Sequence, residues 1–522
     1  MGLLFCTTAQ DNYIWFKSWF LMFRPMSFIH SKNWKEMKTQ KLITYLSLIF
    51  LAGVFFSCDD FLDIEPQQSV SDDAIYADHA GVINALNGAW SLVGSSNLYA
   101  GTSIFHSDLV GNSGEVNWIG TFIQYRQWNW KSMDPNDGFI SSKWSVSYKA
   151  IDLINNILES LEVVDEGHRA RVEGEARFIR GILYFELARF YALPYTAGQN
   201  NLGVPLVLTP TAGITEDDYP ARATVGTVYQ QVLEDLNLAN QLLAALPTGP
   251  GANGGRATSS TASAFLSRVH LAMGNWEHAA QYANTVIGNF GGYDAMHDHP
   301  RSAFNNDEYT SEDVFMINQN PTSNAGQANS GIATFFASLD GLGRGDVYAS
   351  AAYFDMFEPD DLRIQMTEDT GISTIADVPT MFYIGVGTDS GNEMTAKWGK
   401  HDANVQVIRL AEMILTRAEA NFRNGSSIGA NPLDDINAIR NRANASVWTD
   451  LSLDMIYEER LRELSFEGHK LHDIRRFQKS VVAPSGSPHV GETLHWNDWR
   501  LVLPIPQREI DVNENLVQNE GY

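Results

Sequence analysis

Apolar residues recur at steps of three and four throughout Ile456–Phe477, which is the spacing of one face of an α-helix. Acidic and basic residues fill the positions between them and alternate in sign, so they can pair instead of repelling one another. We interpret these charges as structural pairs, within the helix or with neighbouring helices, rather than as an active site. The apolar residues are Ile456, Leu461, Leu464, Phe466, Leu471 and Ile474, and the charged ones are Glu458, Glu459, Arg460, Arg462, Glu463, Glu467, Asp473, Arg475 and Arg476.

The same spacing recurs along the chain and predicts a mainly α-helical protein. Pro194 ends one predicted helix, because proline has no backbone N–H to donate. Another segment resembles a tetratricopeptide (TPR) helix pair, with a turn at Gly274 and Asn275 and the small Ala279 where the helices meet. The predicted helical segments are Ala80–Leu92, Trp144–Leu158, Val172–Tyr191, Val225–Leu246, Ala262–Phe290, Val405–Asn424 and Leu433–Ala443.

A short apolar stretch in the first sixth of the chain is typical of an export signal. Lys38 and Lys41 precede Leu42–Phe56, whose 15 residues are fewer than the roughly 20 that a membrane span needs. Cys58 follows the small Ser57, which predicts a lipoprotein signal at 37–57 and lipidation of Cys58. An ordinary signal peptide or a membrane anchor is the alternative.

These features predict how the chain is organised. Because a signal peptide acts at an N-terminus, residues 1–36 are expected to be a gene-model extension, and either Met1 or Met37 is the true start. A flexible tether at 58–72 is expected to lead into one domain at 73–522, because stacked helix pairs bury their faces only against neighbours. Within that domain we expect TPR-like helices at about 144–290 and 405–477, and ligand-binding loops with a few short strands at about 98–137 and 291–400.

The chain is strongly acidic and has two cysteines. Its formal net charge is −26, and the part from Cys58 onward holds 30 basic against 60 acidic residues, which repels nucleic acid and anionic lipid. Cys6 lies in the doubtful leader and Cys58 is the predicted lipid site, so no disulfide and no cysteine-based site is expected. We predict no nucleic-acid partner and no cofactor.

Motifs for catalysis are missing from the sequence. It contains no HExxH, no GxSxG, no phosphate-binding loop and no dinucleotide fingerprint. His297 and His299, with Asp294 and Asp298, could hold a metal ion, but we interpret this cluster as a solvated loop. The prediction is therefore that the protein has no catalytic residue and no metal site.

Aromatic residues cluster instead in a segment rich in glycine, asparagine and glutamine. Flat rings can stack on the apolar faces of sugars, while amide, carboxylate and guanidinium groups bind the hydroxyls. Trp128 and Trp130 would fall on the same side of an extended chain. The predicted ligand contacts in this segment are Trp118, Tyr125, Trp128 and Trp130, with Asp108 and Asn112 nearby.

Two further sets of residues are candidates for ligand contact. One is Phe335 and Phe336 with Arg344, Asp346 and Tyr348, and the other is Trp398. The alternative for such loop residues is that they anchor the loops to the helical body. The tryptophans on helical stripes are interpreted as packing residues: Trp90, Trp144 and Trp276.

Five segments in chain order resemble signatures of the SusD/RagB family of surface nutrient-binding lipoproteins. They cover much of the chain after Cys58, and the loops at 98–137 and 291–400 match no family motif. The matching segments are GEARFIRGILYFELARFYALPY, RLAEMILTRAEA, INAIRNRA, YEERLRELSFEGHKLHDIRRF and LPIPQREIDVNENLVQNEGY.

The resemblance implies a non-enzymatic lipoprotein of the outer membrane that faces the cell exterior. Such a protein binds a nutrient, here an oligosaccharide or polysaccharide, and covers a SusC-like TonB-dependent β-barrel transporter as a lid. Its implied partners are that transporter, the glycan or another nutrient, and outer-membrane lipid through Cys58. The acidic residues after Cys58 resemble a surface-export signal, although a merely solvated linker has the same composition. A glycan-degrading surface enzyme and a protein-binding TPR-like adaptor are the alternatives.

Overall fold

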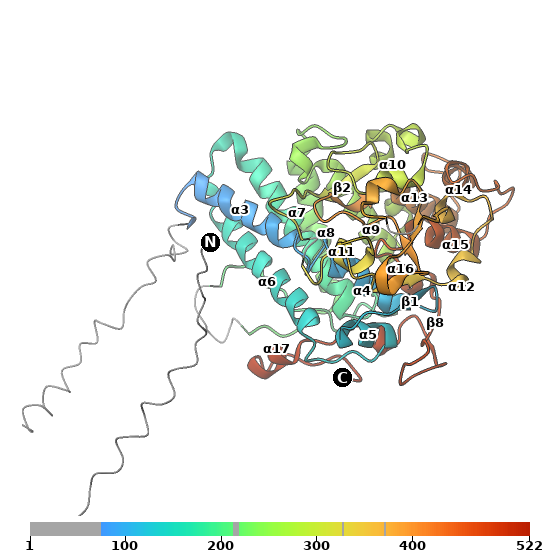
Figure 1. Cartoon of the computed structure of the whole chain (residues 1–522). Helices are drawn as coiled ribbons and strands as arrows, with labels where there is room; N and C mark the ends of the chain where they lie inside the picture. Colours follow the sequence, from blue (N-terminus) through green and yellow to red (C-terminus); the bar gives the residue numbers. More distant parts are fainter. Residues whose placement is uncertain (1–74, 212–218, 326–327, 370–371) are drawn as a thin grey trace, which may run out of the picture. The chain divides into compact units, whose positions relative to one another are not determined.

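Helices make up most of the regular structure, as the apolar spacing predicts. The computed structural model describes residues 75–211, 219–325, 328–369 and 372–522, and these described residues fall in one compact unit (Figure 1). The predicted leader, the signal, Cys58 and the tether lie outside the described residues. Among the described helices none is long and apolar enough to cross a membrane.

The first four long helices of the described chain pack against one another. Helix α3 (His79–Val93) begins at Asp78, whose carboxylate accepts a hydrogen bond from the Gly81 N–H at 2.8 Å, and ends at Gly94. It packs against α6 (Gly138–Glu159) and α7 (Glu166–Tyr191), and α8 (Val225–Leu242) packs along α7. A buried ion pair joins the last two helices, with Arg180 Nε 2.8 Å from Asp235 Oδ2.

Two helical hairpins follow the predicted TPR-like pattern. Helices α9 (Ser259–Met273) and α10 (Trp276–Asn289) are joined at Gly274, which adopts φ +81°, a left-handed conformation that favours glycine. Helices α13 (Leu410–Asn424) and α14 (Pro432–Arg442) form the second hairpin, and α10 packs against both α9 and α13. The predicted mainly α-helical fold with TPR-like hairpins is confirmed.

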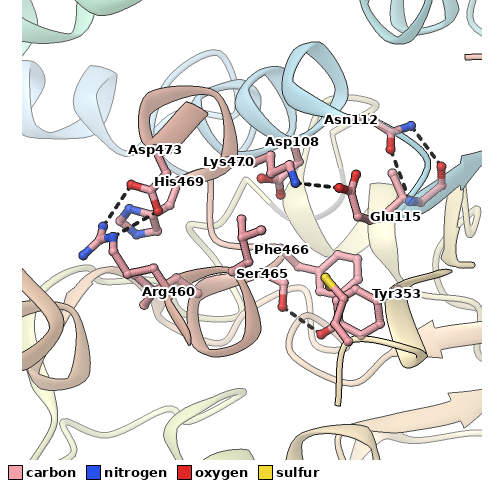
Figure 2. A pocket seen from close by; sticks show the side chains of 14 residues that line it. Asp108, Asn112, Glu115, Tyr353, Arg460, Ser465, Phe466, His469, Lys470 and Asp473 are labelled. Atoms are coloured by element: carbon pink, nitrogen blue, oxygen red, sulfur yellow. Dashed lines mark hydrogen bonds and ion pairs between the residues drawn. The ribbon is translucent and has the colours of Figure 1, made fainter. Parts of the chain in front are cut away.

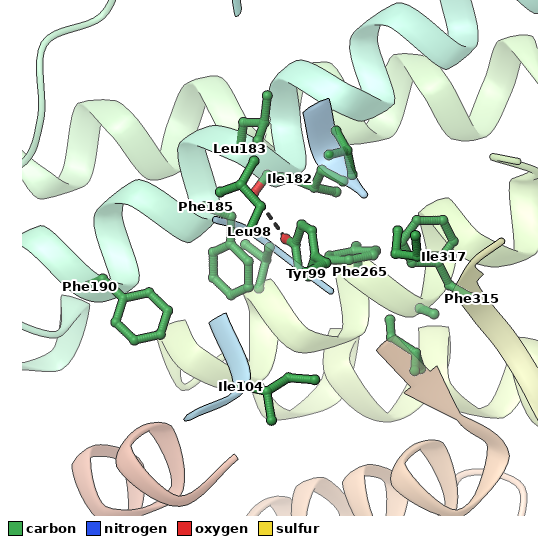
Figure 3. Packing of buried hydrophobic residues seen from close by; sticks show 14 of the residues in the cluster. Leu98, Tyr99, Ile104, Ile182, Leu183, Phe185, Phe190, Phe265, Phe315 and Ile317 are labelled. Carbon is green, nitrogen blue, oxygen red and sulfur yellow. Dashed lines mark hydrogen bonds between the residues drawn. The ribbon is translucent and has the colours of Figure 1, made fainter. Parts of the chain in front are cut away.

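A shared apolar core lies between these helices and the neighbouring loops. Tyr99 is buried there, and its hydroxyl donates to the Ile182 carbonyl at 3.5 Å. Its ring meets Phe265 edge to face, and Phe265 in turn packs against Phe315. Figure 3 shows how side chains from α7, α9 and strand β2 (Asp313–Ile317) meet around Tyr99, so segments far apart in sequence share one core.

Strands are few and short in the described part of the chain. The first pairs are β1 (Val116–Trp118) with β3 (Val347–Ala349), and β2 with β7 (Val405–Arg409), both antiparallel. Strands β4 (Met366–Thr367), β5 (Phe382–Ile384) and β6 (Glu393–Thr395) form a three-stranded sheet, and β8 (Val481–Val482) pairs with β9 (Thr493–Leu494).

The structure corrects three of the predicted segments, namely 98–137, Val405–Asn424 and Ile456–Phe477. The segment 98–137, predicted as loops with strands, contains helices α4 (Thr102–Gly111) and α5 (Ile123–Trp130) as well as β1. The first five residues of Val405–Asn424 form strand β7 rather than helix, because two valines and Ile408 favour pairing with the buried strand β2. The described chain also contains three short helices: α11 (Ile332–Phe336), α12 (Ala351–Phe354) and α17 (Gln507–Val512).

The stretch Ile456–Phe477 is two helices and not one. Helix α15 (Leu453–Leu464) ends before α16 (Lys470–Phe477) begins, and Phe466 and Gly468 between them adopt φ +63° and +79°. A Cβ atom on Gly468 would lie 2.8 Å from Ile104 Cα, so the close approach of α4 requires glycine there.

Most of the alternating charges of this stretch form ion pairs, as predicted, and many of these pairs are buried and reach other elements. Glu463 contacts Arg442 and accepts from Arg409 at 3.2 Å, while Arg460 Nε lies 3.0 Å from Asp473 Oδ2. The surrounding arginines outweigh the effect of burial and lower the pKa of the Glu463 carboxyl. The charges therefore lock α15 and α16 to the rest of the scaffold.

Candidate ligand-binding groove

A solvent-open groove lies where β1, α5 and β8 come together. Its empty space is about 1200 Å³, including the part open to solvent. Trp118 at the end of β1 and Trp130 at the end of α5 both line it, and both residues are partly exposed. The opposite wall comes from the segment Val482–Ser485, more than 350 residues further along the chain.

Trp130 is held in place by contacts on two sides. Its carbonyl accepts a hydrogen bond from Ser487 Oγ at 2.7 Å, which ties the end of α5 to the loop after β8. Gly486 in that loop has φ +85°, and a Cβ atom there would lie 3.3 Å from the indole of Trp130. Arg126, one turn earlier on α5, places its guanidinium carbon 5.6 Å from the ring centre.

Trp118 rests on the aromatic core that lies behind the groove. Its ring stacks on Phe335 with 5.9 Å between centroids, and it meets Tyr125 edge to face at 5.8 Å. A Cβ atom on Gly120 would lie only 2.3 Å from Trp118 Cη2, so the chain can turn back over the ring only with glycine at this position. The backing fixes one face and one edge of the indole.

A buried polar cluster supports the floor of the groove. Asn112 donates to Asn129 Oδ1 at 2.7 Å and to the Val116 carbonyl at 2.9 Å, which shapes the turn into β1. Beneath them Lys131 Nζ donates to the carbonyls of Leu109, Asn112 and Asn129 at 2.8–3.0 Å. Burial lowers the pKa of Lys131 to about 7. These groups position the groove walls, and Asn112 has its side-chain amide fully engaged in doing so.

The rim combines apolar and hydrogen-bonding groups. Ile119 and Val482 line the groove with 42% and 45% of their surface exposed. The amide of Asn117 is exposed and the guanidinium of Arg126 is half-buried beside them. Partly exposed rings next to amide and guanidinium donors suit a ligand with apolar faces and hydroxyl edges.

Several residues predicted to contact ligand are buried, and the structure corrects their predicted placement at a surface. Trp128 lies on helix α5 and not on an extended chain, so it does not share a side with Trp130, and its indole N–H donates to Asp137 Oδ2 at 2.6 Å. Trp398 donates to the Phe466 carbonyl at 2.7 Å. The buried members of the predicted set are Tyr125, Trp128, Phe335, Phe336 and Trp398, all with 3% exposure or less.

Arg344 lies outside the groove. It pairs with Asp346, and its guanidinium carbon lies 4.9 Å from the centre of the Phe122 ring. Because Asp346 also accepts through its backbone from Ile119 N–H at 2.9 Å, Arg344 braces the strand that precedes the groove rim.

Asp108 lines a separate pocket, which lies between α4 and the segment that connects α15 to α16. Figure 2 shows the pocket, with Asp108 and Lys470 on one side and Ser465 and Tyr353 on the other. Burial raises the pKa of Asp108 to about 8. Val116 lines both the pocket and the groove, so the two spaces adjoin through β1.

A second groove lies beside α3 and β2, with about 1260 Å³ of empty space including its open part. Amide and hydroxyl side chains dominate its wall. Trp90 is the aromatic side chain there, and its indole N–H donates to Glu175 Oε2 at 2.8 Å. Among the described residues that line this groove there is one tryptophan, whereas two partly exposed tryptophans line the first groove.

The His297 and His299 cluster does not gather as a metal site. Among the described residues, the potential ligand atoms that lie within 4.8 Å of one another belong to His79, Asp165 and His168. The backbone N–H of His297 donates to Glu312 at 2.8 Å, which ties this loop to the buried ion pairs.

Sequence reasoning missed the C-terminal wall of the groove and the role of Lys131. No local pattern in Val482–Ser485 marks it as a partner of β1, because the two are brought together by the whole scaffold. Lys131 resembles an ordinary surface lysine in sequence, and its left-handed conformation at φ +59° is visible only in the structure. Asn117, Arg126 and Asn129, close to the predicted tryptophans, do line the groove.

Comparison with known proteins agrees with this architecture. Residues 60–271 match a family described as starch-binding and associating with the outer membrane, and residues 364–522 match the SusD family. The chain belongs to the SusD/RagB family.

Individual relatives match either nearly the whole chain or a part of it. SusD-like protein P25 of Formosa agariphila is 25% identical and aligns over 93% of this chain and 100% of its own length. The starch-binding protein SusD of Bacteroides thetaiotaomicron is 36% identical, over 23% of this chain and 22% of its own length. A crystal structure of a putative sugar binding protein from Bacteroides vulgatus is 26% identical, covers 85% of this chain and 99% of its own, and has a TM-score of 0.71.

Proposed function

We propose that the protein is a cell-surface glycan-binding protein that captures an oligosaccharide or polysaccharide in the groove between Trp118 and Trp130. One observation supports this most directly: two partly exposed tryptophans line the same open groove together with amide and guanidinium groups. Sugar rings stack on such faces, and their hydroxyls accept from Asn117 and Arg126. The names of related proteins, a starch-binding protein and a putative sugar binding protein, point to the same ligand class.

The groove suits binding better than turnover. Of the described residues that line it, Arg126 is the charged one and none carries a carboxylate, whereas glycoside hydrolysis ordinarily needs two carboxyl groups beside the bond that breaks. The non-enzymatic function is therefore favoured over a glycan-degrading enzyme. The open groove also distinguishes this chain from a bare TPR-like adaptor, whose helices alone would form the binding surface.

We further propose that the protein delivers its ligand to a SusC-like TonB-dependent transporter in the outer membrane and is anchored there through a lipid on Cys58. Family membership supports both ideas. The predicted tether at 58–72 would let the folded unit move as a lid over the transporter while it stays attached to the membrane. The mainly acidic composition suits a folded unit that stays clear of anionic lipid surfaces.

A glycan panel tests the binding proposal. Native affinity gels containing soluble starch and other polysaccharides compare the wild type with Trp118→Ala, Trp130→Ala and the control Tyr309→Ala, an exposed aromatic residue that lies outside the groove. We expect the polysaccharide to retard the wild type and to remain unhydrolysed. The affinity for the polysaccharide should fall by at least about tenfold in the two groove variants, because each removes a stacking ring worth about 1.5–3 kcal/mol. Hydrolysis would favour an enzyme, and equal retardation of all variants would place the glycan elsewhere, first at the Trp90 groove.

A pull-down tests the transporter proposal. Tagged full-length protein is recovered from the native outer membrane in mild detergent and its partners are identified by mass spectrometry. We expect stoichiometric recovery of a large TonB-dependent barrel and an acylated Cys58. Surface-lipidated protein without a barrel would contradict the lid mechanism and favour an adaptor.

A further inference from the structure

A cationic cavity lies where α7, α9, α15 and α16 meet, apart from the glycan groove. Its empty space is about 610 Å³ including its mouth, and it shares no lining residue with the groove. Five arginines line it, against the two carboxylates of Glu412 and Asp473. The exposed Thr196, in the turn after α7, lies at its edge. The arginines are Arg189, Arg268, Arg460, Arg475 and Arg476.

Charge is not balanced around this cavity, although the chain as a whole has 62 acidic and 36 basic residues. Four of the arginines form ion pairs. Arg268 pairs with Glu412, whereas the other three share their carboxylates with each other or with Lys143 and Arg423. Counting these pairs, seven cationic side chains surround four carboxylates, namely Glu186, Glu412, Glu419 and Asp473.

Arg475 is the uncompensated cation. It is 4% exposed, and within the described residues it pairs with no carboxylate. It donates instead to two backbone carbonyls, those of Arg189 and, at 2.6 Å, Leu501. Burial lowers the pKa of Arg475 to about 10, so its guanidinium stays charged at neutral pH. An anion in the cavity would supply the negative charge that the chain does not provide.

Buried nitrogen atoms without a partner gather on these arginines and on His472. Within the described part of the chain, three guanidinium donors are buried without a hydrogen-bond partner, namely Nε of Arg475, Nε of Arg189 and Nη1 of Arg460. Nε2 of His472 is buried without a partner as well, and it donates in the tautomer that carries the ring proton there. These atoms have little solvent-accessible surface, so small rotations of the side chains are needed before they reach an occupant. Buried donors without acceptors are unfavourable, and guanidinium groups bind oxyanions through two parallel N–H groups.

We infer that this cavity binds a small oxyanion, a sulfate, phosphate or carboxylate group, between Arg475, Arg189 and His472. The site is independent of the glycan groove, and it accepts either a free inorganic anion or the charged group of an acidic sugar. The inference does not extend to neutral sugars. The cavity offers an excess of positive charge and N–H donors, whereas the hydroxyl groups of a neutral sugar need both hydrogen-bond donors and acceptors.

Thermal melting of the full folded protein tests the inference. Sulfate, phosphate, glucuronate and, as a neutral control, glucose are added at constant ionic strength set with sodium chloride. We expect a saturable rise in Tm of a few degrees with at least one oxyanion and none with glucose. Stabilisation by glucuronate alone would identify an acidic sugar as the ligand, and stabilisation by all three would identify a general oxyanion site.

Arg475→Gln is the matched variant, because removing a cation without a carboxylate partner leaves no acid unpaired. It should abolish the anion-dependent rise in Tm, whereas the control Arg500→Gln, whose arginine pairs with Asp498 away from the cavity, should keep it. Equal rises in all three proteins would show a general salt effect and overturn the inference. Should Arg475→Gln fail to fold, crystals of the wild type grown with selenate decide: an anomalous peak inside the cavity supports the site, and its absence overturns it.

Discussion

Arg126 holds its guanidinium carbon 5.6 Å from the centre of the Trp130 ring, one turn apart on α5 and on the same wall of the groove. Such a cation packs one face of the indole and leaves a donor beside it. Arg126→Ala should therefore weaken glycan binding by about three- to tenfold, which corresponds to the loss of roughly 0.7–1.4 kcal/mol, about one hydrogen bond to the ligand. Isothermal titration calorimetry with a glycan that the wild type binds measures the change.

The neighbouring Gln127 provides the control for Arg126. It lies on the same helix but does not line the groove, so Gln127→Ala should bind glycan like the wild type. Both variants should keep the Tm of the parent within about 2 °C, because surface substitutions change stability by about 0.5 kcal/mol. An unchanged affinity in Arg126→Ala would remove the arginine from the proposed site.

Gly468 should tolerate no side chain. It adopts φ +79°, and an added Cβ atom would lie 2.8 Å from Ile104 Cα, so Gly468→Ala should destabilise the protein by about 1–3 kcal/mol. Gly88 lies in α3 with nothing within 4 Å of an added Cβ atom, so Gly88→Ala should stabilise it by about 0.5–1 kcal/mol. Denaturant titrations of both variants should give changes of opposite sign.

Ala279 should be equally intolerant of a large side chain. It is fully buried on α10, packed with Leu271 and Ala420 of the neighbouring helices, so Ala279→Trp should prevent folding or lower Tm by well over 10 °C. Gln281→Trp places the same ring on the exposed side of the same helix and should fold normally. Circular dichroism melts compare them, and a normally melting Ala279→Trp would contradict the TPR-like packing.

The sequence predicted the helices well where local signals and packing agree. Gly274 ends a helix at the predicted turn, and the helical tryptophan Trp144 is buried as expected. The apolar spacing continues across Phe466 and Gly468, however, so periodicity alone could not reveal that α15 and α16 are separate helices. The break depends on α4 approaching from elsewhere in the chain, which no local window contains.

The candidate site was predictable in part. Trp118 and Trp130 line the groove, but Trp128 between them is buried, because α5 turns it inward to meet Asp137. A segment rich in glycine, asparagine and aromatic residues has weak helical signals, and long-range contacts decided its structure. The wall at Val482–Ser485 could not be assigned because sequence separation says nothing about contacts of this range.

Glu186 makes the fold sensitive to acid. This buried carboxylate lies 2.9 Å from Lys143 Nζ and also contacts Arg189. Burial alone would raise the pKa of Glu186, but Lys143 and Arg189 lower it to about 2, below its usual 4.5. A lowered pKa in the folded state means that the stabilisation is present above pH 4.5 and is lost as pH falls toward 2.

The expected loss from this one carboxyl is about 3 kcal/mol of unfolding free energy between pH 7 and pH 2. Glu186→Gln should be less stable at pH 7 by about 3–5 kcal/mol, since it leaves Lys143 buried without its partner, and should lose stability less steeply as the pH falls. Glu173→Gln on the same helix breaks a half-buried pair with Arg177 and should lose stability with acid as steeply as the wild type. Urea titrations at a series of pH values measure all three proteins. If the stability of Glu186→Gln fell with acid as steeply as that of the wild type, the buried pair would not be the source of the acid sensitivity.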